Sequence, residues 1–341
     1  MFWDRLWYAA QSRWHYPLIP ISWLFQAGAT IRRYYQQRRP PKVSVPIVVV
    51  GNLTVGGTGK TPLVIALADM LTQQQLKVGI VSRGYGGRAP QYPYWVTPTS
   101  DPKWVGDEPL LIAQRTRLPV VVAPDRPSAV HYLQQRTPCD VIISDDGLQH
   151  YALPRVFEIV VIDGERGLGN ECCLPAGPLR ESIHRLAQVD LVVVNTQHEH
   201  LFHALRQRYA DMTLNNAWLQ MRLQPGTITS LCQPDLVFTP EVWRGKSLHA
   251  VAAIGHPQRF FQTLRDLNFM PRCHPFADHY SWKPQDLMFG KRSVVVMTEK
   301  DAVKCRAWAM SNLWYLPVDA QFSTADQSML VQWVQKKLTT Q

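Results

Sequence analysis

The chain has 341 residues, of which 46% are hydrophobic, and it carries a formal net charge of +10 at pH 7. A chain of this length and apolar content can bury one large core or two smaller ones, which excludes a disordered tail. The positive charge favours an anionic partner: a nucleotide, a nucleic acid, a phosphorylated substrate or an acidic membrane. The six cysteines show neither a CxxC pair nor a histidine-flanked metal spacing, which favours reduced thiols over a zinc site.

Residues 1–39 form an N-terminal segment that interleaves aromatic rings with arginines. The residues concerned are Phe2, Trp3, Trp7, Tyr8, Trp14, Tyr16, Trp23, Phe25, Tyr34 and Tyr35, with Arg5, Arg13, Arg32, Arg33, Arg38 and Arg39. This combination suits a helical segment that lies in the headgroup layer of a membrane. Pro17 and Pro20 interrupt its least polar part, which argues against both a membrane span and a cleaved signal peptide. We expect a membrane-associating segment, with an aromatic helix packed on the protein's own core as the alternative.

A phosphate-binding loop is predicted at residues 46–61, near the start of a nucleotide-binding domain expected over residues 40–214. The β-branched run 46–50 predicts a buried strand, a glycine-rich turn follows, and a helix begins near Lys60. Glycines let backbone N–H groups surround phosphate oxygens, and the helix N-terminus adds partial positive charge. The residues expected to contact a nucleotide are Thr54, Val55, Gly56, Gly57, Thr58, Gly59, Lys60 and Thr61.

Two side chains of this loop have specific expected roles. Lys60 would reach the β- and γ-phosphates, and the hydroxyl of Thr61 would ligate Mg²⁺. The pattern departs from the usual one at Thr54, because a glycine normally stands five residues before Gly59. An ordinary glycine-rich turn is therefore the alternative, although the remaining glycines still permit a tight loop.

Two predicted strands of this domain are followed by arginines, beyond the strand ends where α/β folds bind ligands. The run 78–82 leads to Arg83 and Tyr85 in a glycine-rich loop, which suits an anionic group or forms a flexible turn. The run 120–122 is followed closely by Arg126.

A third predicted strand ends in the adjacent carboxylates Asp145 and Asp146. In a nucleotide-hydrolysing fold this is a position that holds Mg²⁺, and two adjacent carboxylates repel each other unless a cation is near. An Asp-Gly turn at 146–147 is the alternative.

Two further polar residues have more than one interpretation from the local pattern. Asp107 stands in Gly-Asp-Glu-Pro before an apolar run, which by itself predicts a helix start. Arg180 stands in a proline- and glycine-rich loop, where it suits either a substrate phosphate or a helix cap.

A second, smaller α/β domain is expected over residues 239–341, after an extended two-stranded linker region at 215–238. Its segment 298–301, Thr-Glu-Lys-Asp, is similar to the guanine-reading Asn-Lys-x-Asp of GTPases, but the first position departs and a helix cap is the simpler interpretation. His279 lies in Asp-His-Tyr, and this spacing alone does not separate a catalytic histidine from a structural one.

Together these motifs resemble the tetraacyldisaccharide 4′-kinase family of the lipid A pathway over nearly the whole chain. The matching segments are residues 51–62, 82–86, 106–109, 123–126, 145–150, 175–181, 278–279 and 298–301. One mild departure is Leu148, a position that is often phenylalanine in the family.

The resemblance implies a P-loop NTPase-like α/β/α sandwich, a second smaller α/β domain, and a membrane-associating N-terminal helical segment, with the site between the domains. It implies that ATP and Mg²⁺ are the cofactors. It also implies transfer of the γ-phosphate to the 4′-hydroxyl of tetraacyldisaccharide 1-phosphate, giving lipid IVA, at the cytoplasmic face of the bacterial inner membrane. We expect a monomer that binds its lipid substrate and the membrane surface but no nucleic acid.

The same resemblance assigns roles to individual residues. Asp107 becomes the catalytic base, paired with His279, while Lys60 and Arg126 offset charge on the transferred group. Mg²⁺ would be held by Thr61, Asp145 and Asp146. The residues assigned to the lipid acceptor are Arg83, Tyr85, His150 and Arg180.

Two other classes of protein compete with this interpretation. A GTPase or metallochaperone-type switch shares the Gly-Gly-x-Gly-Lys-Thr pattern, but it would need guanine discrimination and often metal ligands. A nucleic-acid-binding ATPase would fit the net charge, but its arginines should line a groove in the folded domains rather than gather in the aromatic N-terminal segment. Nucleotide preference would separate the first class from a kinase.

Overall fold

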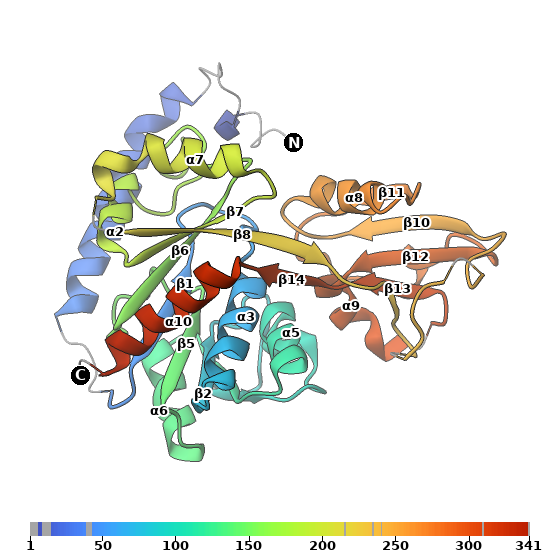
Figure 1. Cartoon of the computed structure of the whole chain (residues 1–341), viewed down its shortest axis with the longest axis horizontal. Helices are drawn as coiled ribbons and strands as arrows, with labels where there is room; N and C mark the ends of the chain where they lie inside the picture. Colours follow the sequence, from blue (N-terminus) through green and yellow to red (C-terminus); the bar gives the residue numbers. More distant parts are fainter. Residues whose placement is uncertain are drawn as a thin grey trace.

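The computed structural model describes residues 6–8, 15–38, 43–214, 216–233, 235–239, 241–308 and 310–339. Two sheets organise these residues into a larger and a smaller unit, which lie side by side in Figure 1. The predicted α/β class is confirmed.

A nine-stranded sheet forms the larger unit, in the order β14-β8-β7-β6-β1-β5-β2-β4-β3. Its strands are β1 (Ile47–Gly51), β2 (Val78–Ser82), β3 (Tyr94–Val96), β4 (Val120–Val122), β5 (Val141–Asp145), β6 (Phe157–Asp163), β7 (Leu191–Asn195), β8 (Ala217–Pro225) and β14 (Val318–Gln321). The seven inner strands are parallel and the two edge strands are antiparallel to their neighbours. Parallel strands place their carboxyl ends along one edge, so the polar residues that follow them meet there.

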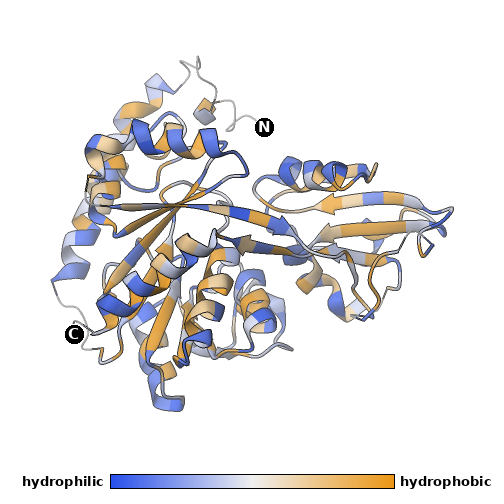
Figure 2. Ribbon diagram, viewed as in Figure 1, coloured by the Kyte–Doolittle hydropathy of each residue, from blue (hydrophilic) through white to orange (hydrophobic). Residues whose placement is uncertain are grey.

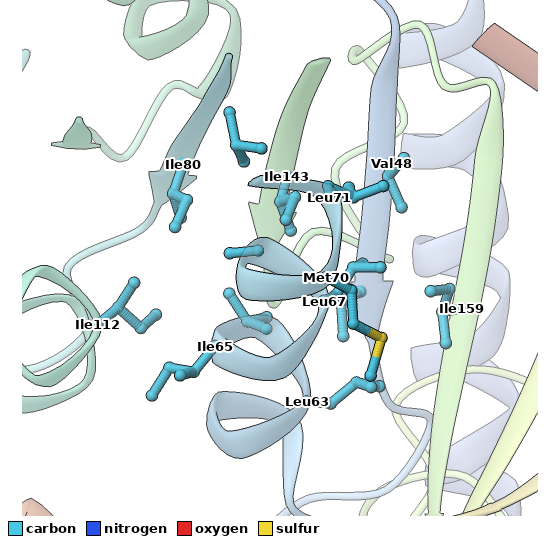
Figure 3. Packing of buried hydrophobic residues seen from close by; sticks show 14 of the residues in the cluster. Val48, Leu63, Ile65, Leu67, Met70, Leu71, Ile80, Ile112, Ile143 and Ile159 are labelled. Carbon is cyan, nitrogen blue, oxygen red and sulfur yellow. The ribbon is translucent and has the colours of Figure 1, made fainter. Parts of the chain in front are cut away.

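Helices cover both faces of this sheet, as expected for an α/β/α sandwich. They are α3 (Lys60–Gln73), α4 (Pro102–Val105), α5 (Asp107–Thr116), α6 (Arg126–Arg136), α7 (Glu199–Arg208) and α10 (Thr324–Thr339), with short 3₁₀ helices η2 (Ile183–Gln188) and η3 (Ala210–Met212). On one face the helix α3 packs Leu63, Leu67 and Leu71 against Val48 and Ile143 of the central strands (Figure 3). In Figure 2 the strands are hydrophobic along most of their length and the helices turn hydrophilic residues outward.

A five-stranded sheet in the order β11-β10-β12-β13-β9 forms the smaller unit. Its elements are β9 (Thr229–Ser230), β10 (Ser247–Ala252), α8 (Pro257–Asp266), β11 (Arg272–Pro275), η4 (Pro284–Leu287), β12 (Ser293–Thr298), α9 (Glu299–Cys305), η5 (Arg306–Trp308) and β13 (Leu313–Leu316). Aromatic residues fill much of its core, where the rings of Trp243 and Trp314 meet edge to face at 5.4 Å. The carboxyl ends of β10 and β12 point towards the larger unit (Figure 1).

The end of the chain returns to the larger sheet, which differs from the expected assignment of residues 239–341 to one second domain. Strand β14 pairs with β8, and Leu330 and Val334 of α10 are buried in the core beside α3. The run 314–318 predicts one strand, but Pro317 separates β13 from β14 because proline cannot donate to a sheet ladder. The extended connection predicted within 215–238 is therefore the outer half of β8 paired with this returning strand.

The N-terminal helix α2 (Ile19–Gln37), preceded by η1 (Tyr16–Leu18), lies along the outside of the larger unit, at the end away from the smaller one (Figure 1). It buries Ser22 but leaves Trp23 66% and Leu24 75% exposed, so its rings do not extend the protein's own core. None of the described helices is long and apolar enough to cross a membrane. The predictions for Phe2, Trp3, Arg5, Arg13, Trp14 and Arg39 lie outside the described residues.

A buried ion pair beneath α2 provides a stability prediction. Glu158 of β6 accepts hydrogen bonds from Arg155 and Arg185, and both Glu158 and Arg185 are buried. Glu158→Gln should lower the free energy of unfolding by about 3 kcal/mol, because it removes the nearer carboxylate of the buried Arg185 and leaves, among the described residues, only that of Glu181 at 3.6 Å. Urea unfolding measures this, with Glu199→Gln as the control because the Glu199–His203 pair is exposed and should contribute about 0.5 kcal/mol or less. Equal losses in both variants would contradict the prediction.

Candidate active site

The predicted phosphate-binding loop joins β1 to α3 in the larger unit. Gly56 and Gly59 adopt φ values of 103° and 98°, which L-residues with a Cβ rarely reach. The side chain of Asn52 lies inside the loop, donating to the carbonyl oxygen of Thr54 at 2.7 Å and accepting from Lys60 Nζ at 3.1 Å. The loop is thus held open around backbone N–H groups, as binding of phosphate oxygens requires.

The two predicted carboxylates at the end of β5 occupy different environments. Asp145 is almost fully buried, accepts a hydrogen bond from Ser82 Oγ at 2.9 Å, and keeps its other oxygen without a partner among the described residues. Burial, reinforced by the charges of Glu108 and Asp146, raises the pKa of Asp145 well above its ordinary value. This orphaned carboxylate oxygen indicates a site that a cation would complete.

Asp146 is the more accessible carboxylate and contacts two cations. Arg180 Nη1 lies 3.0 Å and Lys60 Nζ 3.6 Å from its oxygens. Although burial raises the pKa of Asp146, the charges of Lys60 and Arg180 outweigh it and hold the pKa below its ordinary value. Asp146 is therefore ionised at neutral pH and links the phosphate-binding loop to Arg180.

Arg126 lies where the sequence predicts it but in a different role. It is fully buried, and its guanidinium donates to the carbonyl oxygens of Ala123 and Asp145, each at 2.9 Å. Burial lowers its pKa to about 10, which leaves it charged at neutral pH. This arrangement supports the backbone under Asp145 and does not favour the expected direct contact with a transferred phosphate.

Asp107 and His279, 172 positions apart in the sequence, meet between the two units. Asp107 is the first residue of α5, and its Oδ1 atom lies 3.2 Å from His279 Nδ1 on the loop that follows β11. His279 adopts φ 57°, an uncommon conformation for a residue with a side chain, and its ring packs edge-on against Tyr85 at 4.9 Å. The Oδ2 atom of Asp107 is buried and lacks a hydrogen-bond partner among the described residues.

The electrostatics of Asp107 keep its carboxylate ionised. Burial raises its pKa, but the hydrogen bond to His279 and the charges of Lys300 and Lys304 outweigh burial and bring the pKa below its ordinary value. The other oxygen, Oδ2, lies 3.5 Å from Lys304 Nζ and makes no hydrogen bond to a described residue, so an ionised Asp107 keeps the capacity to accept one from a substrate hydroxyl.

The four residues predicted for the acceptor, Arg83, Tyr85, His150 and Arg180, line one cavity of about 610 Å³ together with Asp146. The opposite wall comes from α2 and includes Leu24, Phe25, Arg32 and Arg33. An apolar and basic helix therefore faces the anion-binding residues across the cavity. Burial and the nearby arginines lower the pKa of His150 to about 3, so it is neutral and can hydrogen-bond but adds no charge.

Sequence reasoning missed several residues of the site. Glu108 and Lys300 form an ion pair of 2.9 Å beside Asp107. In the sequence, each is marked only by the motif that contains it, Gly-Asp-Glu-Pro for Glu108 and Thr-Glu-Lys-Asp for Lys300. Arg259 of α8 donates to Asn195 at 3.1 Å, and Asn195 donates to the carbonyl oxygen of Thr58 at 2.9 Å. This relay connects the smaller unit with the phosphate-binding loop.

The residues fit a magnesium ion that also contacts phosphates. Among the described residues, no three His, Cys, Asp or Glu side chains gather in a group that could hold a metal. Magnesium at nucleotide sites commonly takes one or two carboxylates and completes its shell with phosphates and water. The site offers oxygen ligands of this kind: the hydroxyl of Thr61, the unpartnered oxygen of Asp145 and the carboxylate of Asp146.

Comparisons with known proteins identify the family of this chain. The sequence model described as tetraacyldisaccharide-1-P 4′-kinase matches residues 14–339. The chain is 46% identical to the tetraacyldisaccharide 4′-kinase of Nitrosococcus oceani, over 98% of this chain and 96% of that one. It is 47% identical to the enzyme of the same name from Hahella chejuensis, over 94% and 93%.

A solved structure agrees with the fold. A crystal structure of LpxK from Aquifex aeolicus in complex with ATP superposes with a TM-score of 0.77 at 24% identity, covering 95% of this chain and 99% of that one. The chain therefore belongs to the tetraacyldisaccharide 4′-kinase family and is an ATP-dependent kinase of lipid A biosynthesis.

Proposed function

We propose that this chain transfers the γ-phosphate of ATP to the 4′-hydroxyl of tetraacyldisaccharide 1-phosphate in a Mg²⁺-dependent reaction that yields lipid IVA. The observation that carries the proposal is the pairing of Asp107 with His279 between the two units. Asp146 contacts Lys60 of the phosphate-binding loop and also lines the cavity under α2. A nucleotide and a lipid headgroup can thus approach the same carboxylate.

Asp107 acts as the base in this proposal. The acceptor hydroxyl donates to the Asp107 carboxylate, the hydroxyl oxygen bonds to the γ-phosphorus, and the bond to the bridging oxygen of ADP breaks. The proton of the hydroxyl passes to Asp107. A weak base suffices because phosphoryl transfer has a loose transition state in which positioning and electrostatics contribute most. His279 holds the carboxylate through Oδ1 and stabilises its charge.

Lys60 offsets the charge on the β- and γ-phosphates and leaves its resting contacts with Asn52 and Asp146 to do so. Thr61, Asp145 and Asp146 would hold Mg²⁺. When bound, the ion would supply positive charge that offsets the charge of the phosphates. Arg126 supports the backbone at the end of β5 through its hydrogen bond to the carbonyl oxygen of Asp145.

Arg83 is assigned to an anionic group of the acceptor, the 1-phosphate or a neighbouring headgroup. Arg83→Ala should raise the KM for the lipid about tenfold and leave the KM for ATP unchanged, since one charge-assisted contact is worth about 1.5–3 kcal/mol. Steady-state kinetics in detergent micelles measures both values. Arg180→Ala should affect both substrates because Arg180 also binds Asp146. An unchanged lipid KM in Arg83→Ala would remove Arg83 from the acceptor site.

Helix α2 is assigned to the membrane surface at the cytoplasmic face of the inner membrane. Trp23 and Ile31 are exposed on it and do not line the cavity. Replacing both with serine should weaken binding to phosphatidylglycerol–phosphatidylethanolamine vesicles at least about tenfold, because each apolar side chain contributes about 1.5–3 kcal/mol when buried. Vesicle flotation measures this, with Leu214→Ser as an exposed apolar control elsewhere in the larger unit. Unchanged binding would place the membrane contact outside α2.

The deciding experiment measures transfer of labelled γ-phosphate from MgATP to tetraacyldisaccharide 1-phosphate in detergent micelles. We expect labelled lipid with ATP, little with GTP, and none when EDTA removes divalent cations. A folded, nucleotide-binding protein that hydrolyses GTP and labels no lipid would overturn the proposal in favour of a switch protein. Sedimentation of the detergent-dispersed enzyme tests the expected monomer.

A further inference from the structure

The segment 298–301 has no role in the mechanism so far, although it lies beside the site. Thr298 caps α9, and its Oγ1 atom donates to Asp301 at 2.7 Å. Asp301 is fully buried and also accepts from the backbone N–H of Ala253 and from Trp282 Nε1, each at 3.0 Å. Both of its oxygens are therefore occupied within the protein. Asp301 anchors α9 to the end of β10 and does not have the free carboxylate that reading a guanine base requires.

This anchoring directs two lysines of α9 towards the larger unit. Lys300 Nζ lies 2.9 Å from Glu108 Oε1, 3.9 Å from Asp107 Oδ2 and 3.5 Å from His279 Nε2. Lys304 Nζ lies 3.5 Å from Asp107 Oδ2 and is itself held by Asp301 Oδ1 at 3.2 Å. Both lysine side chains are mostly buried, so solvent screens their charges little.

The contacts around His279 favour one position for its ring proton. Lys300 Nζ lies 3.5 Å from His279 Nε2, closer than Asp278 Oδ1 at 3.9 Å, and because an ammonium can only donate, this contact favours an Nε2 that accepts. The remaining ring proton is then on Nδ1, the atom that faces Asp107. Lys300 therefore selects the tautomer of His279 that can hydrogen-bond to the carboxylate.

We propose that Lys300 and Lys304 are positioning residues for phosphoryl transfer, which hold Asp107 as a carboxylate and His279 in the tautomer that orients it. The proposal rests on the proposed function of Asp107 as the base. Because both lysines belong to the smaller unit and Asp107 to the larger one, the base is complete only when the two units are in contact. Other charged groups near Asp107 and Lys300 are Glu108 on α5 and Asp278 on the loop of His279.

The expected pH dependence follows from the opposing influences on Asp107. Burial raises its pKa, whereas the hydrogen bond to His279 and the charges of Lys300 and Lys304 lower it below its ordinary value. Removing one lysine charge should raise the pKa by about one unit, the scale of a single neighbouring charge. The base is active when deprotonated, so activity would then be lost at a higher pH than in the wild type.

The test measures kcat between about pH 3 and 8 for the wild type, Lys300→Gln, Lys304→Gln and Lys300→Arg. We expect the acid limb of kcat to move upward by about one unit in each glutamine variant, with activity recovering towards neutral pH. Lys300→Arg should keep the wild-type limb because it retains the charge. Lys246→Gln removes an exposed charge from the same unit and should match the wild type.

Each outcome either supports or overturns the proposal. A uniform loss in Lys300→Gln at every pH, or an unchanged profile, would overturn it, because a structural role alone does not move a titration. Lys300→Gln, which leaves the bonds of Asp301 intact, decides the result if Lys304→Gln fails to fold. An active Asp107→Asn would instead refute the base itself. An inactive Asp107→Asn with an unshifted Lys300→Gln profile would refute only the role of the lysines.

Discussion

Asp107→Asn is expected to lower kcat by about 10²- to 10⁴-fold, the range that general-base catalysis contributes. The amide cannot take the proton of the acceptor hydroxyl, and its neutral oxygen accepts a weaker hydrogen bond than the carboxylate does from the Nδ1 atom of His279, 3.2 Å away. The KM for ATP should change little, because the described contacts of Asp107 are with His279 and the two lysines of α9. Phosphate transfer to the lipid at saturating substrates measures the effect.

This substitution also separates catalysis from a structural role at the helix start. Gly106 is the N-cap of α5 and Asp107 follows it, so a purely structural Asp107 would lose only its favourable interaction with the helix dipole, about 0.3–1 kcal/mol. Asp125→Asn provides the matched control, because Asp125 caps α6 by accepting from the backbone N–H of Ser128 at 3.0 Å. Near wild-type activity in both variants, with similar melting temperatures, would return Asp107 to the role of a helix-start residue.

The second large effect is expected for Lys60→Met, which should lower kcat by about 10²- to 10³-fold, as the loss of one preorganised transition-state donor does. Lys60 is the buried cation of the phosphate-binding loop, poised between Asn52 and Asp146. Its removal leaves charge on the transferred phosphate uncompensated. Methionine preserves the apolar stem, so α3 should remain packed.

Single-turnover transfer of labelled phosphate separates the chemical step from ATP binding in this variant. Lys103→Met provides the control, because Lys103 is an exposed lysine of the same unit at the start of another helix. Wild-type turnover in Lys60→Met would show that the loop binds nucleotide without taking part in transfer, and the mechanism above would need a different cation.

Local patterns in the sequence predicted most of the larger unit. β-branched runs identify β1, β2, β4 and β5 because parallel strands buried on both faces must be apolar throughout. Local patterns also identify the glycines of the phosphate-binding loop and the carboxylates at the end of β5. Each motif stands within a few positions of a predicted strand. The motif resemblance then led to the family.

Local sequence patterns do not predict contacts between residues that are far apart in the chain. The pattern 314–318 predicted one strand, and nothing local indicates that the residues after Pro317 pair with β8 or that α10 packs beside α3. Arg126 has the position of an anion-binding residue, yet tertiary packing buries it under Asp145. Whether an arginine binds an anion or supports the backbone depends on its burial. Burial is set by segments that are distant in the sequence.

The sequence by itself determined the phosphate-binding loop, the apolar strands and the basic aromatic helix, because each depends on residues within a few positions of one another. Only the tertiary structure decided that His279, Lys300 and Lys304 surround Asp107 and that α2 closes the cavity holding Arg83 and Arg180. The physical reason is that the protonation and partners of a carboxylate are set by charges within a few ångströms, and here those charges come from residues more than 170 positions away.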